Sequence, residues 1–484
     1  MIRKHTGALA AFVAVLSAAC PRPGHAKATL ADATPPAAEA DTWAQCRGDN
    51  ADAAVAACTA LIGTGGLSGK DLANAYVLRG SAHDDRHEYE LALADYTKAI
   101  EIDETNADAY YNRALLYQEH HQNDLALADY AQAIALDPKD LASYDNRGAI
   151  YTARGDYDHA IADHTMAMQL DPTSAISASD RGAAYFHKGA YDRAIADYTT
   201  AIALDPRFAT AYANRGDAYN HTGRFDLGIA DFTQALAIDP NNVHAYEGRA
   251  RAYSERGQLD LAVADYGKAM DLAPKHAASY IGRGSLYART GKYDLAIADF
   301  THALALDPAS VTAYGDRGNA YAQTHRLDLA LADYGKALEL NPKSVETYYC
   351  RGGAYFLMKK YDLAVADYSQ ALALQPTLTF ALVYRGDAYA YLKEYDEAVA
   401  DYSQTIALAP RFAAAYANRG SILWVVRHDP AGLDDLKKAV ALDPSFGDFE
   451  VQVEGVRSDT PPIQPNIKPS VAGMPKPVVF VQPD

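Results

Sequence analysis

The sequence contains no signature of a common catalytic site. HExxH, GxxxxGK[ST] and GxSxG do not occur, and Gly282–Gly284, which begins like a dinucleotide-binding loop, lacks the third glycine of that motif. The 15 histidines are scattered, and the close pairs His83/His87 and His120/His121 lack cysteine or carboxylate partners at metal-ligand spacing. We therefore expect no enzyme activity, no metal site, no cofactor and no small-molecule substrate.

A long apolar segment and an excess of basic residues are also missing. The apolar run over residues 8–19 is shorter than the roughly 20 residues that span a bilayer. Lysine and arginine number 44 and the acids 62, which gives a formal charge of −18. Such an acidic chain repels nucleic-acid phosphates and anionic lipid surfaces, so neither is an expected partner.

The first residues predict an export signal. Arg3 and Lys4 precede the apolar run, and small residues before position 27 suit cleavage after Ala26, so residues 1–26 are interpreted as a signal peptide. The alternative is lipidation at Cys20, which would anchor the protein to the outer membrane. Pro21 and the absence of leucine three residues before Cys20 disfavour it. The expected location is periplasmic or secreted.

The two ends of the chain differ in composition from the rest. Residues 27–40 form a linker rich in alanine, proline and aspartate, with no periodicity, and are expected to be disordered. Residues 447–484 contain seven prolines and are expected to be an extended, disordered tail.

Between the ends, a 34-residue unit repeats eleven times over residues 73–446 without insertion or deletion. We number positions so that Leu141 is position 1 and Ser174 is position 34. An arginine at position 7 is followed sixteen residues later by an aspartate at position 23 in every copy. The arginines are Arg79, Arg113, Arg147, Arg181, Arg215, Arg249, Arg283, Arg317, Arg351, Arg385 and Arg419. A fixed period of this length predicts a solenoid.

Each copy reads as two short amphipathic helices joined by a turn. Positions 4, 7, 8 and 11 form one stripe at helical spacing, and positions 17, 20, 21, 24, 27 and 28 form a second. Gly155 at position 15 is placed to end the first helix and Asp156 to begin the second, while Pro172 at position 32 closes the unit. One unit cannot bury both stripes, so neighbouring units must stack.

This pattern resembles the tetratricopeptide repeat family. It shares glycine or alanine at position 8, tyrosine at position 11 from Tyr117 to Tyr389, alanine at 20, an aromatic residue at 24 and proline at 32. The departures are Gly228 and Gly432 in place of alanine at position 20, and Glu104 in place of proline at position 32. Arginine at position 7, where the family has leucine, is a further departure. The resemblance implies an all-α fold, a right-handed superhelical solenoid of helix-turn-helix repeats.

Positions that are fixed in every copy are expected to serve stacking. The arginine at position 7 and the aspartate at position 23 lie near the interhelical seam, so we predict a charge-assisted pair within or between repeats. The tyrosines, which gather at positions 4, 11, 17 and 24, are interpreted as core.

The resemblance also implies a role for two cysteines. Continuing the phase backwards places Cys46 and Cys58 at positions 8 and 20 of a degenerate capping hairpin over residues 41–72, where paired helices of the family pack most closely. An oxidising compartment favours a disulfide between them, and two buried thiols are the alternative. Cys350 is expected to be a free thiol.

Positions 2, 5, 6, 9, 12 and 13 form another stripe on the first helix, which in the family lines the concave groove that binds extended peptides. Asparagine at position 6, which recurs here, is suited to hydrogen bonding with a bound main chain. The candidate protein-binding residues are Asn112, Asp145, Asn146, Asp180, Asn214, Asp217, Asp316, Asp387 and Asn418. A solvated polar helix face is the alternative interpretation.

The charge of this stripe indicates the kind of partner. Its acids outnumber its bases, and no copy carries the lysines at positions 2 and 5 with which some chaperone-binding members hold a carboxylate. We expect a basic or neutral protein or peptide partner and a scaffold in the bacterial cell envelope. The alternatives are a lipid-anchored adaptor for secretion or polysaccharide export, and a regulatory subunit of a separate enzyme such as a glycosyltransferase.

Overall fold

The computed structural model describes residues 40–446, and the chain divides into two compact units after Ala252. We treat the N-terminal unit, residues 40–252, and the C-terminal unit, residues 253–446, separately. The predicted signal peptide, Cys20, nearly all of the 27–40 linker and the 447–484 tail lie outside the described residues. No helix among residues 40–446 is both long and apolar enough to cross a membrane.

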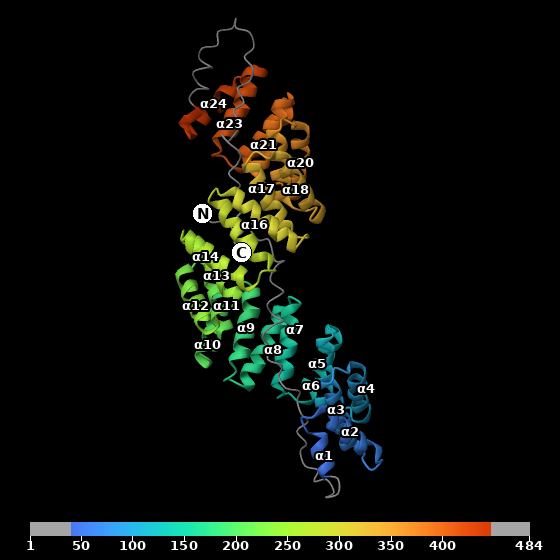
Figure 1. Ribbon diagram of the computed structural model, residues 1–484. Coiled ribbons are helices and arrows are strands. Elements are labelled where there is room, and N and C mark those ends of the chain that lie inside the picture. Colours follow the sequence, from blue (N-terminus) through green and yellow to red (C-terminus); the bar gives the residue numbers. More distant parts are fainter. Residues whose placement is uncertain (1–39, 447–484) are drawn as a thin grey trace. The chain divides into compact units, whose positions relative to one another are not determined.

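The N-terminal unit consists of successive helix pairs (Figure 1). Its helices are α1 (Ala40–Cys46), α2 (Ala51–Gly63), α3 (Gly69–Asp85), α4 (Tyr89–Ile102), α5 (Ala107–Glu119), α6 (Asn123–Leu136), α7 (Leu141–Ala153), α8 (Tyr157–Leu170), α9 (Ala175–His187), α10 (Tyr191–Leu204), α11 (Ala209–His221), α12 (Phe225–Ile238) and most of α13 (Val243–Glu255).

The C-terminal unit continues the same alternation. Its helices are α14 (Leu259–Leu272), α15 (Ala277–Arg289), α16 (Tyr293–Leu306), α17 (Val311–Gln323), α18 (Leu327–Leu340), α19 (Val345–Leu357), α20 (Tyr361–Leu374), α21 (Thr379–Leu392), α22 (Tyr395–Leu408), α23 (Ala413–Ser421) and α24 (Ala431–Leu442), with a π-helix at Ile422–Val426 and a 3₁₀ turn at Pro444–Phe446. Residues 40–446 contain no strand, so the predicted all-α helix-turn-helix solenoid is confirmed.

The turn inside each pair depends on one left-handed residue. The residue at position 15 has positive φ in ten of the copies, and it is glycine only in the central ones. The residues are Gly155, Gly189, Gly223, Gly257 and Gly291, flanked by His87, His121, His325, Lys359 and Lys393. In the last copy the π-helix shifts this conformation to His428. Left-handed backbone is unfavourable for residues with a Cβ, so the outer copies carry local strain.

His121→Gly should therefore stabilise the protein. His121 has a φ of 58° and is exposed, so glycine removes roughly 1 kcal/mol of backbone strain, partly offset by the larger entropy of the unfolded chain. We expect a net gain of about 0.5 kcal/mol in urea unfolding. The matched change Gly189→Ala, at φ 79°, should destabilise by roughly 1 kcal/mol. A gain from Gly189→Ala would contradict this account of the turn.

The core of each copy is a small residue against an aromatic ring. A Cβ added to Gly80 would lie 2.8 Å from Cε1 of Tyr96, and Ala92 and Ala99 are fully buried beside that ring. Small residues at positions 8, 20 and 27 thus let the two helices approach closely. The interpretation of all tyrosines as core holds fully only at position 24, since those at positions 4 and 11 are mostly half-buried.

The half-buried tyrosines flank the arginine at position 7. In each of the ten copies that lie wholly within one unit, this arginine donates from Nε and Nη2 to the two carboxylate oxygens of the aspartate at position 23, at 2.7–2.9 and 2.7–3.0 Å. The guanidinium carbon of Arg215, for example, lies 5.7 and 5.9 Å from the ring centroids of Tyr212 and Tyr219. We call each bidentate pair of this arginine and this aspartate a clamp.

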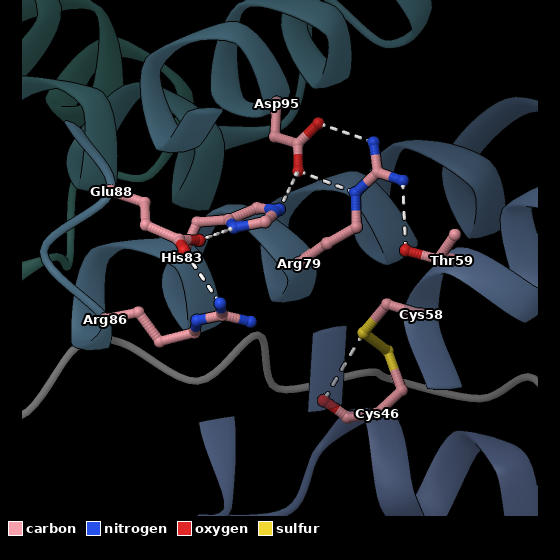
Figure 2. A network of polar contacts seen from close by, with 8 residues as sticks. All are labelled: Cys46, Cys58, Thr59, Arg79, His83, Arg86, Glu88 and Asp95. Carbon is pink, nitrogen blue, oxygen red and sulfur yellow. Dashed lines mark hydrogen bonds and ion pairs between the residues drawn. A yellow bond between two sulfur atoms is a disulfide. The ribbon is translucent and has the colours of Figure 1, made fainter. Parts of the chain in front are cut away.

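The clamp also joins neighbouring copies. Where position 25 of the preceding copy is threonine or serine, its hydroxyl accepts a third hydrogen bond from Nη1 of the clamp arginine, as Thr199 does from Arg215 at 2.9 Å. Figure 2 shows the first clamp, Arg79–Asp95, whose third contact is Thr59 of α2 at 3.3 Å. In these copies the clamp arginine ties both helices of its own copy to the second helix before it, whereas Arg147, Arg283 and Arg351, which follow Ala131, Gly267 and Gly335, lack this contact.

The N-terminal end carries a disulfide between Cys46 of α1 and Cys58 of α2, with the two Cα atoms 4.9 Å apart (Figure 2). Trp43, Leu61 and Leu78 pack around it. Cys350 is a free thiol. The disulfide thus joins the two helices that precede the first complete copy.

The glycines that depart from alanine at position 20 have local reasons. A Cβ at Gly432 would lie 2.5 Å from the backbone nitrogen of Trp424, which belongs to the π-helix. A Cβ at Gly228 would lie 2.6 Å from the side-chain oxygen of Asn220. Both glycines accommodate an unusual neighbour at the closest approach of the pair.

Candidate functional site

The first helices of successive copies lie on the inner side of each unit. Contacts between consecutive first helices recur in both units (α3·α5, α7·α9 and α9·α11, then α15·α17, α17·α19 and α19·α21), whereas among residues 40–446 no pair of consecutive second helices makes comparable contact. A stack whose first helices touch and whose second helices are spread apart curves toward the first helices. We call the surface formed by positions 2, 5, 6, 9, 12 and 13 the first-helix face.

Two contacts recur along this face. Position 5 of one copy meets position 6 of the next, as when Asn146 Nδ2 donates to the Tyr111 hydroxyl at 3.4 Å. Position 9 also meets position 6 of the next copy, as when Ser285 Oγ donates to Asp316 Oδ2 at 3.1 Å. The candidate residues at positions 5, 6 and 9 therefore form continuous rows within each unit.

The position-6 row of the N-terminal unit runs over α5, α7, α9 and α11. Asn112 is 1% exposed, and neither its amide oxygen nor its amide nitrogen has a hydrogen-bond partner. Asn146, Asp180 and Asn214 are half-buried. A buried amide without partners is unfavourable by about 1–3 kcal/mol, so this row carries hydrogen-bonding capacity that the fold does not use.

Asp145 lies beside this row but is engaged within the protein. It accepts a hydrogen bond from Ser177 Oγ at 2.7 Å and lies 3.1 Å from Nδ1 of His164. His164 occupies position 24, which is aromatic in most copies, and was not singled out from the sequence although its departure from that pattern was visible. Burial raises the pKa of the neighbouring Asp180 to about 6, against the opposing charge of His164.

Asp217 is also engaged, as a buried carboxylate with two basic partners. Arg251 Nη2 donates to it at 2.8 Å, and His244 Nε2 lies 2.5 Å from its second oxygen. Burial opposes its ionisation, but the charges of His244 and Arg251 lower its pKa to about 2. Asp217 therefore contributes little unbalanced charge to the first-helix face.

Of the three candidates in the C-terminal unit, Asp387 and Asn418 contact each other and Asp316 lies apart. Asp387 is fully buried and accepts hydrogen bonds from the Tyr402 hydroxyl at 2.7 Å and from Asn418 Nδ2 at 2.8 Å. Asp316 is half-buried, with Ser285 as its hydrogen-bond donor, and burial raises its pKa to about 6.

Six of the nine candidates lie in the N-terminal unit and three in the C-terminal unit. Asp145, Asp217, Asp387 and Asn418 are hydrogen-bonded to neighbouring copies, Asn146 and Asp316 each have one such bond, and both polar atoms of Asn112 lack a partner. Within residues 40–446 no three His, Cys, Asp or Glu side chains are grouped so that they could hold a metal ion. The arrangement offers amides and carboxylates for recognition of a partner.

Family models match most of the repeat region. Models described as TPR repeat match residues 73–120, 182–223, 284–325, 318–359 and 386–424, and models described as tetratricopeptide repeat match residues 107–140, 209–242, 232–264 and 345–378. Together these matches cover more than half of the chain. No curated protein matches it.

Several solved structures are similar to the chain. YrrB, described as a TPR protein with an unusual peptide-binding site, is 24% identical over 37% of this chain and 92% of its own, with a TM-score of 0.33. The Cut9–Hcn1 hetero-tetramer of the APC/C is 15% identical over 86% and 95%, with a TM-score of 0.42. Yeast Tom70 is 16% identical over 80% and 97%, with a TM-score of 0.39.

Proposed function

Because this chain belongs to the tetratricopeptide repeat family, we propose that it is a scaffold that binds an extended segment of a partner protein along its first-helix face. The observation that carries the proposal is the position-6 row of Asn112, Asn146, Asp180 and Asn214. Amides offer both a donor and an acceptor, which a peptide main chain requires. Neither polar atom of the buried Asn112 amide has a hydrogen-bond partner within the protein.

We further propose that the protein acts in the cell envelope. The basic and apolar N-terminal residues support export, and the Cys46–Cys58 disulfide suits an oxidising compartment. The partner is proposed to be basic or neutral, because carboxylates outnumber bases on the first-helix face.

Replacing Asn146, Asp180 and Asn214 together by alanine should weaken peptide binding by at least about tenfold, since each lost hydrogen bond contributes about 0.5–1.5 kcal/mol. Nonapeptides would be selected from a displayed random library with the wild-type protein, and their dissociation constants measured by fluorescence anisotropy. The matched control replaces Gln169, Thr200 and Gln234, which are exposed on the second helices of the same copies.

The control should bind the selected peptides like the wild type, and all three proteins should melt at similar temperatures. Cross-linking in an envelope extract would then identify the natural partner, which the wild type should capture and the triple variant should not. Equal affinity of the triple variant and the wild type for the selected peptides would place the binding site elsewhere.

A further inference from the structure

Two carboxylates lie on the first-helix face of the C-terminal unit without a base. They are Asp316 on α17 and Glu346 on α19. Asp316 has only the Ser285 hydroxyl as a donor, and among the described residues no ion pair involves Glu346. The one base at the face positions of α15, α17, α19 and α21 is Arg289, which is held by Glu255 at 2.7 Å and Ser254 at 3.1 Å.

The charge of Asp316 acts on Glu346. Partial desolvation, together with this charge, raises the pKa of Glu346 to about 7, and burial raises that of Asp316 to about 6. Water still reaches the exposed Glu346 side chain and screens part of this repulsion. The folded protein thus places two acids where their ionised forms are disfavoured and supplies no counter-charge.

Two buried tyrosine hydroxyls lie on α19 and α21. Tyr349 on α19 is 6% exposed and Tyr384 on α21 is 7% exposed, and neither hydroxyl has a hydrogen-bond partner. Their ring centroids are 6.0 Å apart. Glu346, Tyr349 and Cys350 lie three and four residues apart on one side of α19, and the charges of Asp316 and Glu346 both act on the Cys350 thiol.

There is room beside the carboxylates. Position 5 of α17 is Gly315, directly before Asp316, and a Cβ added there would meet no other side chain or neighbouring helix within 4 Å. Other copies carry larger residues at this position, for example Tyr349 and Val383. The space, the unbalanced acids and the unpaired hydroxyls are three separate features of one site.

We propose that α17, α19 and α21 form a subsite for one cationic side chain, lysine or arginine, of the partner segment bound along the first-helix face. This inference rests on the proposed function and adds the charge that the partner must carry at this point. An ammonium group has three donors, enough for Asp316, Glu346 and one tyrosine hydroxyl. A charge-assisted hydrogen bond to a carboxylate is about twice as strong as a neutral one.

The test compares two labelled peptides on the full-length protein. One consists of lysine alternating with alanine, and the other carries Nε-acetyl-lysine at the same places, which keeps the aliphatic stem and removes the charge. Fluorescence anisotropy at low salt measures both dissociation constants. The wild type should prefer the lysine peptide, and Asp316→Asn/Glu346→Gln should reduce that preference about tenfold.

A matched control removes the same charge elsewhere. Asp328→Asn/Asp362→Asn changes two exposed carboxylates on the second helices of the same copies and should keep the preference. Gly315→Phe retains both carboxylates but fills the space, and should lose the preference as well. An equal reduction in the two double variants, or an unchanged preference in Asp316→Asn/Glu346→Gln, would overturn the subsite. Binding of the library-selected nonapeptides, measured in parallel, judges the proposed function independently.

Thermal melting separates this role from a structural one. A carboxyl whose pKa is raised in the folded state destabilises the protein above that pKa, so at pH 8 the amide variant should melt at the same or a higher temperature. At pH 5, where both carboxyls are protonated in the fold, the difference should shrink. The facing Cys350, Tyr349, Tyr384 and Tyr334 are neutral at both pH values, since burial raises their pKa. A lower melting temperature at pH 8 would assign the carboxyls to the scaffold and overturn the proposal.

Discussion

Asp231→Ala should lower the free energy of unfolding by about 3 kcal/mol, because it removes one partner of a mostly buried ion pair. Asp231 is 7% exposed and accepts two hydrogen bonds from Arg215, at 2.7 and 2.9 Å. Alanine leaves the Arg215 guanidinium between two tyrosine rings with Thr199 as its remaining acceptor. The Arg215 guanidinium then stays at the interhelical seam without a carboxylate partner.

The measurement must account for the repeat architecture. Each copy contacts only its neighbours, so a lesion in one copy divides the stack into segments that unfold separately. We expect a broadened urea transition and, in hydrogen exchange, a loss of amide protection centred on α11 and α12. Unchanged protection in these two helices together with an unchanged transition midpoint would show that the clamp is dispensable.

Two further substitutions separate the contribution of the threonine from that of the aspartate. Thr199→Ala removes only the contact between copies and should lower the unfolding free energy by about 1 kcal/mol. Asp163→Ala acts in a copy where the preceding position 25 is Ala131, so Arg147 would keep no side-chain acceptor. Its effect should equal or exceed that of Asp231→Ala. The reverse order would contradict the proposed contribution of the threonine.

The repeat period predicted most of the fold because every copy faces the same packing problem. Arginine and aspartate sixteen residues apart were expected to pair within or between repeats, and the structure shows this pair within each copy, while a different residue makes the link between copies. Aspartate is bound within the copy and threonine across copies, as for Arg215. The threonine could not be anticipated, since position 25 varies and its reach depends on how two copies stack. The π-helix at Ile422–Val426 was equally hidden, because it is a local change of helix type confined to the last copy.

The candidate site was less predictable than the fold, because the contacts of its residues differ from copy to copy. Position 6 could be found by comparing copies, and one member of that row, the buried Asn112, lacks hydrogen-bond partners. The engagement of Asp145 and Asp217 could not be read in this way. Their partners, such as His164 and His244, occur in single copies, so a comparison that seeks shared residues passes over them.

Removing the disulfide by Cys46→Ser/Cys58→Ser should release α1 from the end of the stack. The bond closes a loop with a sequence separation of 12, for which the chain-entropy estimate is about 3 kcal/mol. Helix α1 has seven residues, and its main contacts among residues 40–446 are with α2 and α3. A helix this short is not stable alone in water. The rest of the stack should keep its helices, because it retains its own clamps and neighbours.

Trp43 reports this change directly. It is 5% exposed and packs with Cys46 and Cys58, and the one other tryptophan, Trp424, can be replaced by phenylalanine to isolate its signal. Reduction or the double serine change should shift the emission of Trp43 to longer wavelength and lower the temperature of the unfolding transition that this signal reports. Cys350→Ser should change neither. If Trp43 remains buried with unchanged emission in the serine variant, packing against Leu61 and Leu78 alone holds the cap. If it is released, the cap formed by α1 and α2 is complete only where the disulfide can form, which links the stability of this end of the scaffold to the export proposed for it.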